Sequence, residues 1–179
     1  MKSINLARTL AFLSLATAAT VFAVGRARAA GDQLVDHVRT ANERFQDVRA
    51  AIAEDYVPVG CFGTLNGGAM GVRYVNAGYL RDKAVDLKRP QALLYDPQPD
   101  GSMMLLAVQY MAATGPANLE GQPFAFIGKP SVYDVEPFYE LTVWAWASNP
   151  QGAFADINPQ VSCSRAERAG QPHVIFDLD

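Results

Sequence analysis

The chain has 179 residues, half of them apolar by composition, and a formal net charge of −3. This length corresponds to one ordinary domain with enough apolar side chains for a core. The basic residues Lys2, Arg8, Arg26 and Arg28 all lie within the first 30, so the remainder is more acidic than the whole. The remaining basic residues form no stripe, which argues against a surface that binds nucleic acid.

The first 30 residues have the pattern of a secretory signal peptide. Lys2 and Arg8 provide a basic start, an apolar run covers residues 10–24, and small residues stand at Ala27 and Ala29. Small residues at these two positions are what signal peptidase requires. We therefore expect cleavage before Ala30 or one residue later, followed by export to the periplasm or the medium.

The export prediction leaves residues 31–179 as a single mature domain. An uncleaved N-terminal anchor stays open as the alternative, because Arg26 and Arg28 are unusual beside a cleavage site. Against an anchor, the apolar run of about 15 residues is shorter than the roughly 20 that a spanning helix needs. The mature part contains no apolar run long enough to cross a membrane.

Residues 32–55 are predicted to form one amphipathic helix. Apolar side chains recur there at alternating spacings of four and three, which places them on one helix face. Asp32 suits the start of the helix, and Pro58 favours its end because proline disfavours helix in the preceding residue. The stripe consists of Leu34, Val38, Ala41, Phe45, Val48 and Ile52.

Short apolar runs separated by turn-forming residues follow the helix and predict strands. Residues 78–90 are expected to form a loop or short helix, and residues 114–137 are expected to be mostly irregular. Strands that are adjacent in sequence and joined by short connections favour an antiparallel sheet. The predicted fold class is therefore α+β, with the N-terminal helix packed on a mainly antiparallel sheet. The predicted strands are 69–76, 91–95, 103–112, 138–147 and an edge strand over 174–176.

The only two cysteines are Cys61 and Cys163. In an exported protein, two cysteines predict one disulfide, which here closes a loop of about 100 residues and contributes at most roughly 4–5 kcal/mol. A metal site would need more ligands nearby, and neither cysteine belongs to a Cys-x-x-Cys pair. We therefore predict a disulfide and no metal site or cofactor.

The strand over 138–147 contains the most suggestive candidates for a ligand site. Its alternation places Glu140, Thr142, Trp144 and Trp146 on one face. Two indole rings beside a carboxylate and a hydroxyl are typical of a small-molecule pocket. Packing of the tryptophans in the core, against the helix, is the alternative.

Two further side chains are candidates for the same site. Arg73 lies among apolar residues in the strand over 69–76, and it can pair with Glu140 if the two strands are neighbours. His37 flanks the apolar stripe of the helix, where an ordinary, partly exposed histidine is the alternative.

Four segments carry a recognisable pattern: 59–61, 68–76, 89–95 and 139–163. They include Gly-Ala-Met-Gly-Val-Arg-Tyr-Val-Asn at 68–76. This pattern resembles a family of exported bacterial proteins of unknown function. The resemblance implies that relatives often have histidine at the positions of Arg73 and Thr142, where two histidines facing one cavity would make a metal or acid–base site. This chain departs at both positions, so such a site is lost here or replaced by an arrangement of Arg73 and Glu140.

The sequence contains no Gly-rich phosphate loop leading into a helix and no Gly-x-Ser-x-Gly motif. The first hypothesis is therefore an exported domain that binds a small molecule or an envelope protein without catalysis. The alternative is a hydrolase-like or metal-dependent enzyme with a degenerate site around Arg73, Glu140 and Thr142.

Overall fold

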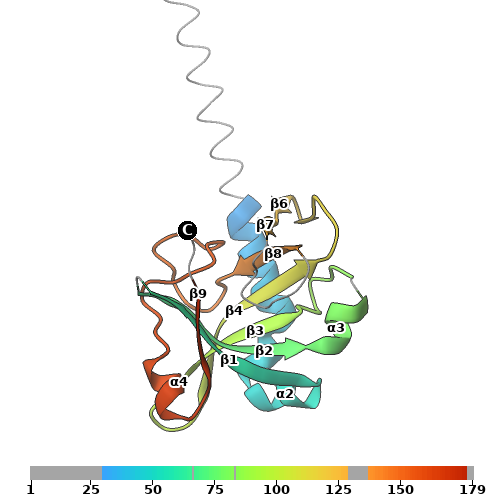
Figure 1. The fold of residues 1–179 in the computed structure, drawn as a ribbon. Helices are drawn as coiled ribbons and strands as arrows, with labels where there is room; N and C mark the ends of the chain where they lie inside the picture. The colour runs from blue at the N-terminus through green and yellow to red at the C-terminus, as the bar shows by residue number, and fades with distance from the viewer. Residues whose placement is uncertain (1–29, 66, 83, 129–136, 177–179) are drawn as a thin grey trace, which may run out of the picture. The chain divides into compact units, whose positions relative to one another are not determined.

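The computed structural model describes residues 30–65, 67–82, 84–128 and 137–176 (Figure 1). The chain divides into two compact units, residues 1–33 and 34–179. Within the first unit the described residues are helical. The predicted signal peptide, apart from Ala30, lies outside the described residues. In the described part of the chain, no helix is both long and apolar enough to cross a membrane.

The predicted single helix over 32–55 is wrong in its extent. Residues 30–42 are helical, a short 3-10 helix η2 follows at Glu43–Gln46, and helix α2 covers Val48–Ala53. The chain is already helical at residue 30, so Asp32 does not begin the helix. Between η2 and α2, the backbone of Asp47 is extended, and its carboxylate accepts a hydrogen bond from the Arg49 N–H. This side-chain cap starts a new helix.

The interruption at Asp47 changes which side chains face the core. Leu34, Val38 and Phe45 are buried as predicted, but Ile52 is 56% exposed and Ala51 is buried in its place. A helix that restarts does not keep the phase of the preceding one, so the apolar stripe is displaced by one residue.

Within the described residues, seven strands form one sheet, in the order β7-β8-β4-β3-β2-β1-β9. Neighbouring strands are antiparallel except for β1 and β9, which are parallel. The predicted α+β class with a mainly antiparallel sheet is therefore confirmed. The strands are β1 (Tyr56–Thr64), β2 (Ala69–Asn76), β3 (Ala92–Pro97), β4 (Met103–Ala112), β7 (Ala125–Ile127), β8 (Phe138–Val143) and β9 (His173–Phe176). Short elements between them are α3 (Ala77–Asp82), α4 (Ser164–Arg168) and a two-stranded sheet of β5 (Asn118–Leu119) and β6 (Gln122–Pro123).

Strand β8 is shorter than the predicted strand over 138–147. After Val143 the chain leaves the sheet, and the backbone N–H groups of Trp146 and Ala147 donate to the carbonyl of Leu106. Leu106 has no partner on β3 because the register shifts by one residue beside it. Such a β-bulge leaves backbone groups without a partner in the ladder. Here the Leu106 carbonyl of β4 accepts from Trp146 and Ala147 instead, just beyond the end of β8.

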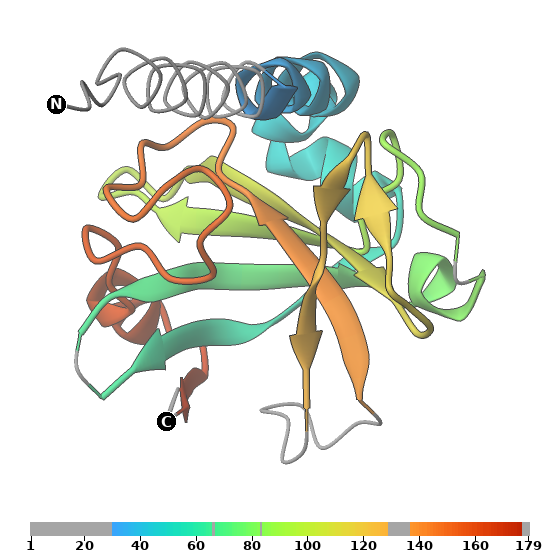
Figure 2. The same cartoon turned by 90° about the horizontal axis from the view of Figure 1, so that it is seen from above.

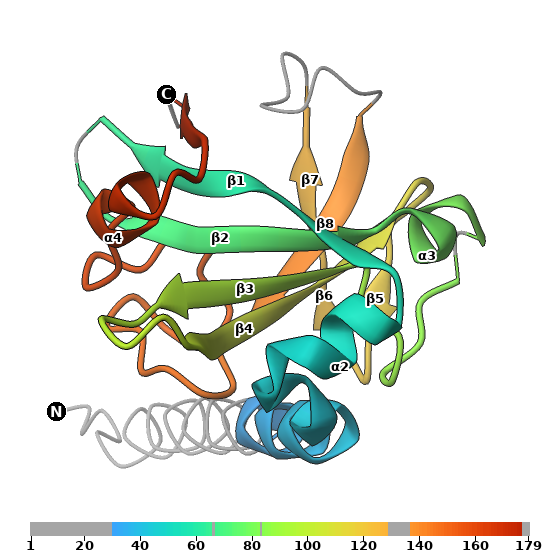
Figure 3. The ribbon, with the colours of Figure 1, turned by 90° about the horizontal axis from the view of Figure 1, so that it is seen from below.

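The sheet has two differently covered faces. On one face lie the helical residues after Gln33 and α2 (Figure 3), where the Tyr95 hydroxyl donates to the Phe45 carbonyl at 2.6 Å. The Tyr110 hydroxyl donates to the Leu87 carbonyl at 2.8 Å on the same face. Figure 2 shows the opposite face, along which the chain after β8 runs. In that chain, Asn158 forms an antiparallel bridge to Ala69 on β2.

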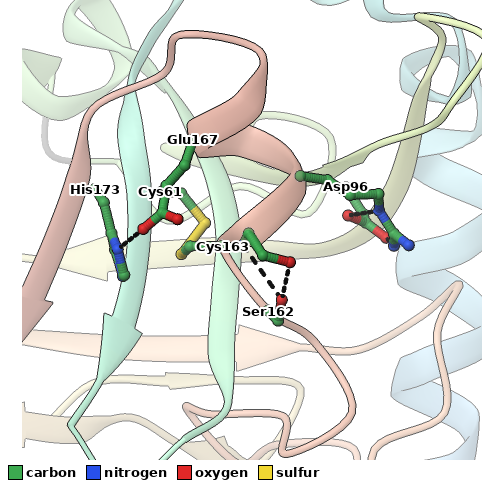
Figure 4. Close-up of a disulfide and its surroundings, with 8 residues drawn as sticks. Cys61, Asp96, Ser162, Cys163, Glu167 and His173 are labelled. Atoms are coloured by element: carbon green, nitrogen blue, oxygen red, sulfur yellow. Dashed lines mark hydrogen bonds and ion pairs between the residues drawn. A yellow bond between two sulfur atoms is a disulfide. The ribbon is translucent and has the colours of Figure 1, made fainter.

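The predicted disulfide between Cys61 and Cys163 is confirmed, with a Cα–Cα distance of 5.6 Å. It joins β1 to the residue that precedes α4 (Figure 4). Both cysteines are buried in the core. The bridge therefore fixes α4 against the sheet.

Candidate functional site

Arg73 on β2 and Glu140 on β8 form a buried ion pair. The Arg73 Nη2 atom lies 2.8 Å from the Glu140 Oε2 atom, and the two residues are only 1% and 2% exposed. The strands β3 and β4 separate β2 from β8. In a flat sheet, three strand spacings alone would hold the two backbones about 14 Å apart. The two side chains therefore reach across β3 and β4 to meet each other.

Gln109 on β4 connects the ion pair to Thr142. Its Nε2 atom donates to Glu140 Oε1 at 2.7 Å and to Thr142 Oγ1 at 3.0 Å. Both oxygens of the Glu140 carboxylate therefore accept a hydrogen bond, one from Arg73 and one from Gln109. The sheet register explains the arrangement, because Gln109 and Thr142 lie directly opposite each other on β4 and β8.

The Gln109 amide leaves one acceptor unused. Its NH₂ group must face the Glu140 carboxylate, since a carbonyl oxygen there would face another acceptor. The Gln109 Oε1 atom then points away from Glu140. It is buried, and it accepts no hydrogen bond from the residues that the structure describes. Leaving such an acceptor without a donor costs about 1–3 kcal/mol.

Asp156, in the chain that follows β8, contributes a second carboxylate to this cluster. Burial raises the pKa of Asp156, while the Thr142 hydroxyl and the charge of Arg73 oppose that shift. A hydrogen-bonded chain thus runs from Glu140 through Gln109 to Thr142.

Burial also governs the ion pair itself. It raises the pKa of the Glu140 carboxyl, and the adjacent charge of Arg73 opposes the shift. The Arg73 guanidinium also lies 5.8 Å from the Phe62 ring centroid and 3.7 Å from Met111 Sδ. A buried charge needs its partner, so each member of the pair depends on the other.

The sequence-predicted candidates are only partly brought together. Arg73, Glu140 and Thr142 lie together, although the strands of Arg73 and Glu140 are not the neighbours that the predicted pairing assumed. The strand alternation that placed Trp144 and Trp146 beside them ends with β8 at Val143. The Trp144 indole N–H donates instead to the Ala155 carbonyl at 2.6 Å.

The remaining candidates lie apart from the cluster or pack beside the core. Trp146 is half-buried against the core, and its indole N–H donates to none of the described residues. His37 is exposed, and its Nδ1 atom lies 2.8 Å from Glu120 Oε2. His37 therefore corresponds to the alternative given for it, an ordinary exposed histidine.

Two members of the cluster were missed from the sequence. Gln109 carried a usable signal, since it is a lone amide in an otherwise apolar strand, as Arg73 is a lone charge in its own strand. Asp156 carried none, because it lies in an irregular segment whose path across the sheet depends on the tertiary structure.

Comparisons with protein-family models, curated proteins and solved structures give no match for this chain. Among the described residues, no group of three or more His, Cys, Asp and Glu side chains is arranged to hold a metal ion. The family resemblance of the sequence therefore stays a prediction.

Proposed function

We propose that the protein is an exported domain that binds a small molecule, without catalysis, at the cluster of Arg73, Glu140, Gln109, Thr142 and Asp156. A protein partner in the cell envelope is the competing occupant. The observation that carries the proposal is the buried Gln109 Oε1 atom, which lacks a donor among the described residues. A ligand with an N–H or O–H group would supply that donor.

Export is supported by two independent features. The first 30 residues have the composition of a signal peptide. Cys61 and Cys163 form a disulfide, a bond that persists mainly in oxidising compartments.

The contacts within the cluster favour binding over catalysis. Glu140 has both oxygens engaged, and the two cysteines are joined to each other. His37 and His173 pair with glutamates outside the cluster. The enzyme alternative rests on Asp156, whose raised pKa would suit a proton donor.

Native mass spectrometry of the protein purified from an envelope extract tests the binding proposal. We expect a small non-covalent adduct on the wild type and its loss from Gln109→Met, which removes the acceptor at similar volume. Asp36→Asn, a change at an exposed carboxylate on the helix, serves as the control and keeps the adduct. A wild type free of adduct, and unshifted in thermal unfolding by a panel of small amines and polyols, would overturn the proposal.

The export proposal has its own test. The mass and N-terminal sequence of the protein recovered from cells are expected to show a chain that starts at Ala30 or Gly31. A full-length chain in the membrane fraction would instead establish the uncleaved anchor.

A further inference from the structure

A hollow of about 410 Å³ lies between the turn that joins β3 to β4 and the residues of α4. This volume is within the range of small-molecule sites. Its lining is apolar on one side, with Pro97, Pro99 and Met103, and polar on the other, with Arg165, Arg168 and Gln171. None of these residues belongs to the cluster around Arg73 and Glu140.

Arg165 is held in place at the wall of this hollow. Its Nε atom donates to Asp96 Oδ1 at 3.2 Å and its Nη2 atom donates to Asp96 Oδ2, so the contact is two-pronged. Asp96 is only 5% exposed, whereas the Arg165 side chain is 43% exposed. The Nη1 atom makes no hydrogen bond to any described residue and remains available to a ligand.

The backbone that carries Arg165 is fixed as well. Cys163 immediately precedes α4, and its disulfide to Cys61 ties this end of the helix to β1. The Gln98 side chain donates to the Asp96 carbonyl at 2.9 Å, which holds the opposite wall. A guanidinium oriented before binding loses less conformational entropy when it binds a ligand.

Arg168 adds a second guanidinium to the hollow and forms no ion pair within the described part of the chain. The neighbouring acid Glu167 is already paired with His173. Among the described residues, Asp96 is therefore the one carboxylate that pairs with an arginine at this wall, and it pairs with Arg165 alone. Arginine forks bind carboxylates in two-pronged fashion.

We propose that this hollow binds a small-molecule carboxylate with an apolar body. The carboxylate contacts Arg165 and Arg168, and the apolar body packs on Pro97, Pro99 and Met103. The apolar wall distinguishes this ligand from a bare inorganic anion, which would gain nothing from those side chains. The site is separate from the one in the proposed function, and neither depends on the other.

Isothermal titration calorimetry with hexanoate tests this proposal on the purified, disulfide-bonded protein. We expect saturable binding of hexanoate, no binding of hexanol, and affinity about tenfold weaker or more for Arg168→Gln. Arg81→Gln is the matched control, since Arg81 is likewise an exposed arginine in the last turn of a short helix. It should bind as the wild type does.

Three results would overturn the inference: no saturable binding of hexanoate, equal affinities of Arg168→Gln and Arg81→Gln, or inorganic phosphate binding as tightly as hexanoate. Gln109→Met separates the two proposals, because it should abolish binding at the cluster and leave hexanoate binding unchanged. Arg165→Lys provides a second variant, which keeps the charge beside Asp96 and loses the two-pronged geometry.

Discussion

Arg73 on β2 pairs with Glu140 on β8 at 2.8 Å, across two intervening strands. The pair links two strands that share no backbone hydrogen bond, and Gln109 on β4 joins it from between them. Since both charges are almost fully removed from water, each depends on the other for its counter-charge.

The first prediction concerns this ion pair. Arg73→Ala should lower the free energy of unfolding by about 3–5 kcal/mol, because it leaves the Glu140 carboxylate buried without its counter-charge. The double variant Arg73→Met, Glu140→Leu should recover much of that loss. Urea denaturation measures both, with the exposed Arg81→Ala as a control that is expected to change stability by about 0.5 kcal/mol or less. Equal losses for Arg73→Ala and Arg81→Ala would contradict the role of the pair.

The second prediction concerns pH and Asp156. Because burial raises the pKa of Asp156 in the folded state, its protonated form is favoured there. The folded state binds the Asp156 proton more tightly than the unfolded state does, and this stabilises the fold. The stabilisation is complete below the unfolded-state pKa of about 3.9 and is lost as the pH rises through the higher pKa of the folded state. Relative to the wild type, Asp156→Asn should gain stability between pH 4 and pH 7, as measured by denaturation at both values. No relative gain, or the opposite sign, would show that Asp156 is not desolvated.

The third prediction concerns the disulfide. Thiol titration of the denatured, non-reduced protein should find no free thiol. Replacing Cys61 and Cys163 together by alanine should lower the free energy of unfolding by up to about 4–5 kcal/mol, since the bridge spans 102 residues. The same variant should weaken hexanoate binding, because α4 loses its covalent attachment to β1. Unchanged hexanoate binding would show that Asp96 alone positions Arg165.

The fourth prediction concerns the approach of the C-terminal chain to β1. Gly60 has a φ of 123°, and a Cβ atom added there would lie 2.8 Å from the Pro172 carbonyl oxygen. Gly60→Ala should therefore cost more than the roughly 1–2 kcal/mol of the unfavourable backbone conformation alone. Gly101→Ala is the matched control, since Gly101 has a φ of 85° and open space around it. Thermal unfolding compares the two, and equal costs would argue against a close contact with Pro172.

Much of the local structure follows from the sequence. Short apolar runs bounded by turn-forming residues located β2, β3 and β4 to within about two residues, because a strand with both faces buried needs apolar side chains throughout. Strand β1 is absent from the sequence prediction, because Pro58 favours the end of a helix over the interior of a strand. β9 pairs with β1 only from Cys61 onward, so Pro58 lies where β1 has no described neighbour on one side and its missing N–H costs no ladder hydrogen bond.

The candidate site, like the fold, could be predicted from the sequence only in part. The sequence identified Arg73, Glu140 and Thr142 as polar side chains on apolar strands, and it predicted the Cys61–Cys163 pair, because composition and alternation are local properties. The tertiary structure alone decided that Gln109 and Asp156 complete the cluster and that Arg165 meets Asp96. These contacts depend on strand order, on the curl of the sheet and on where the chain turns after β8. Each of those is set by packing among residues far apart in the sequence, which local periodicity does not encode.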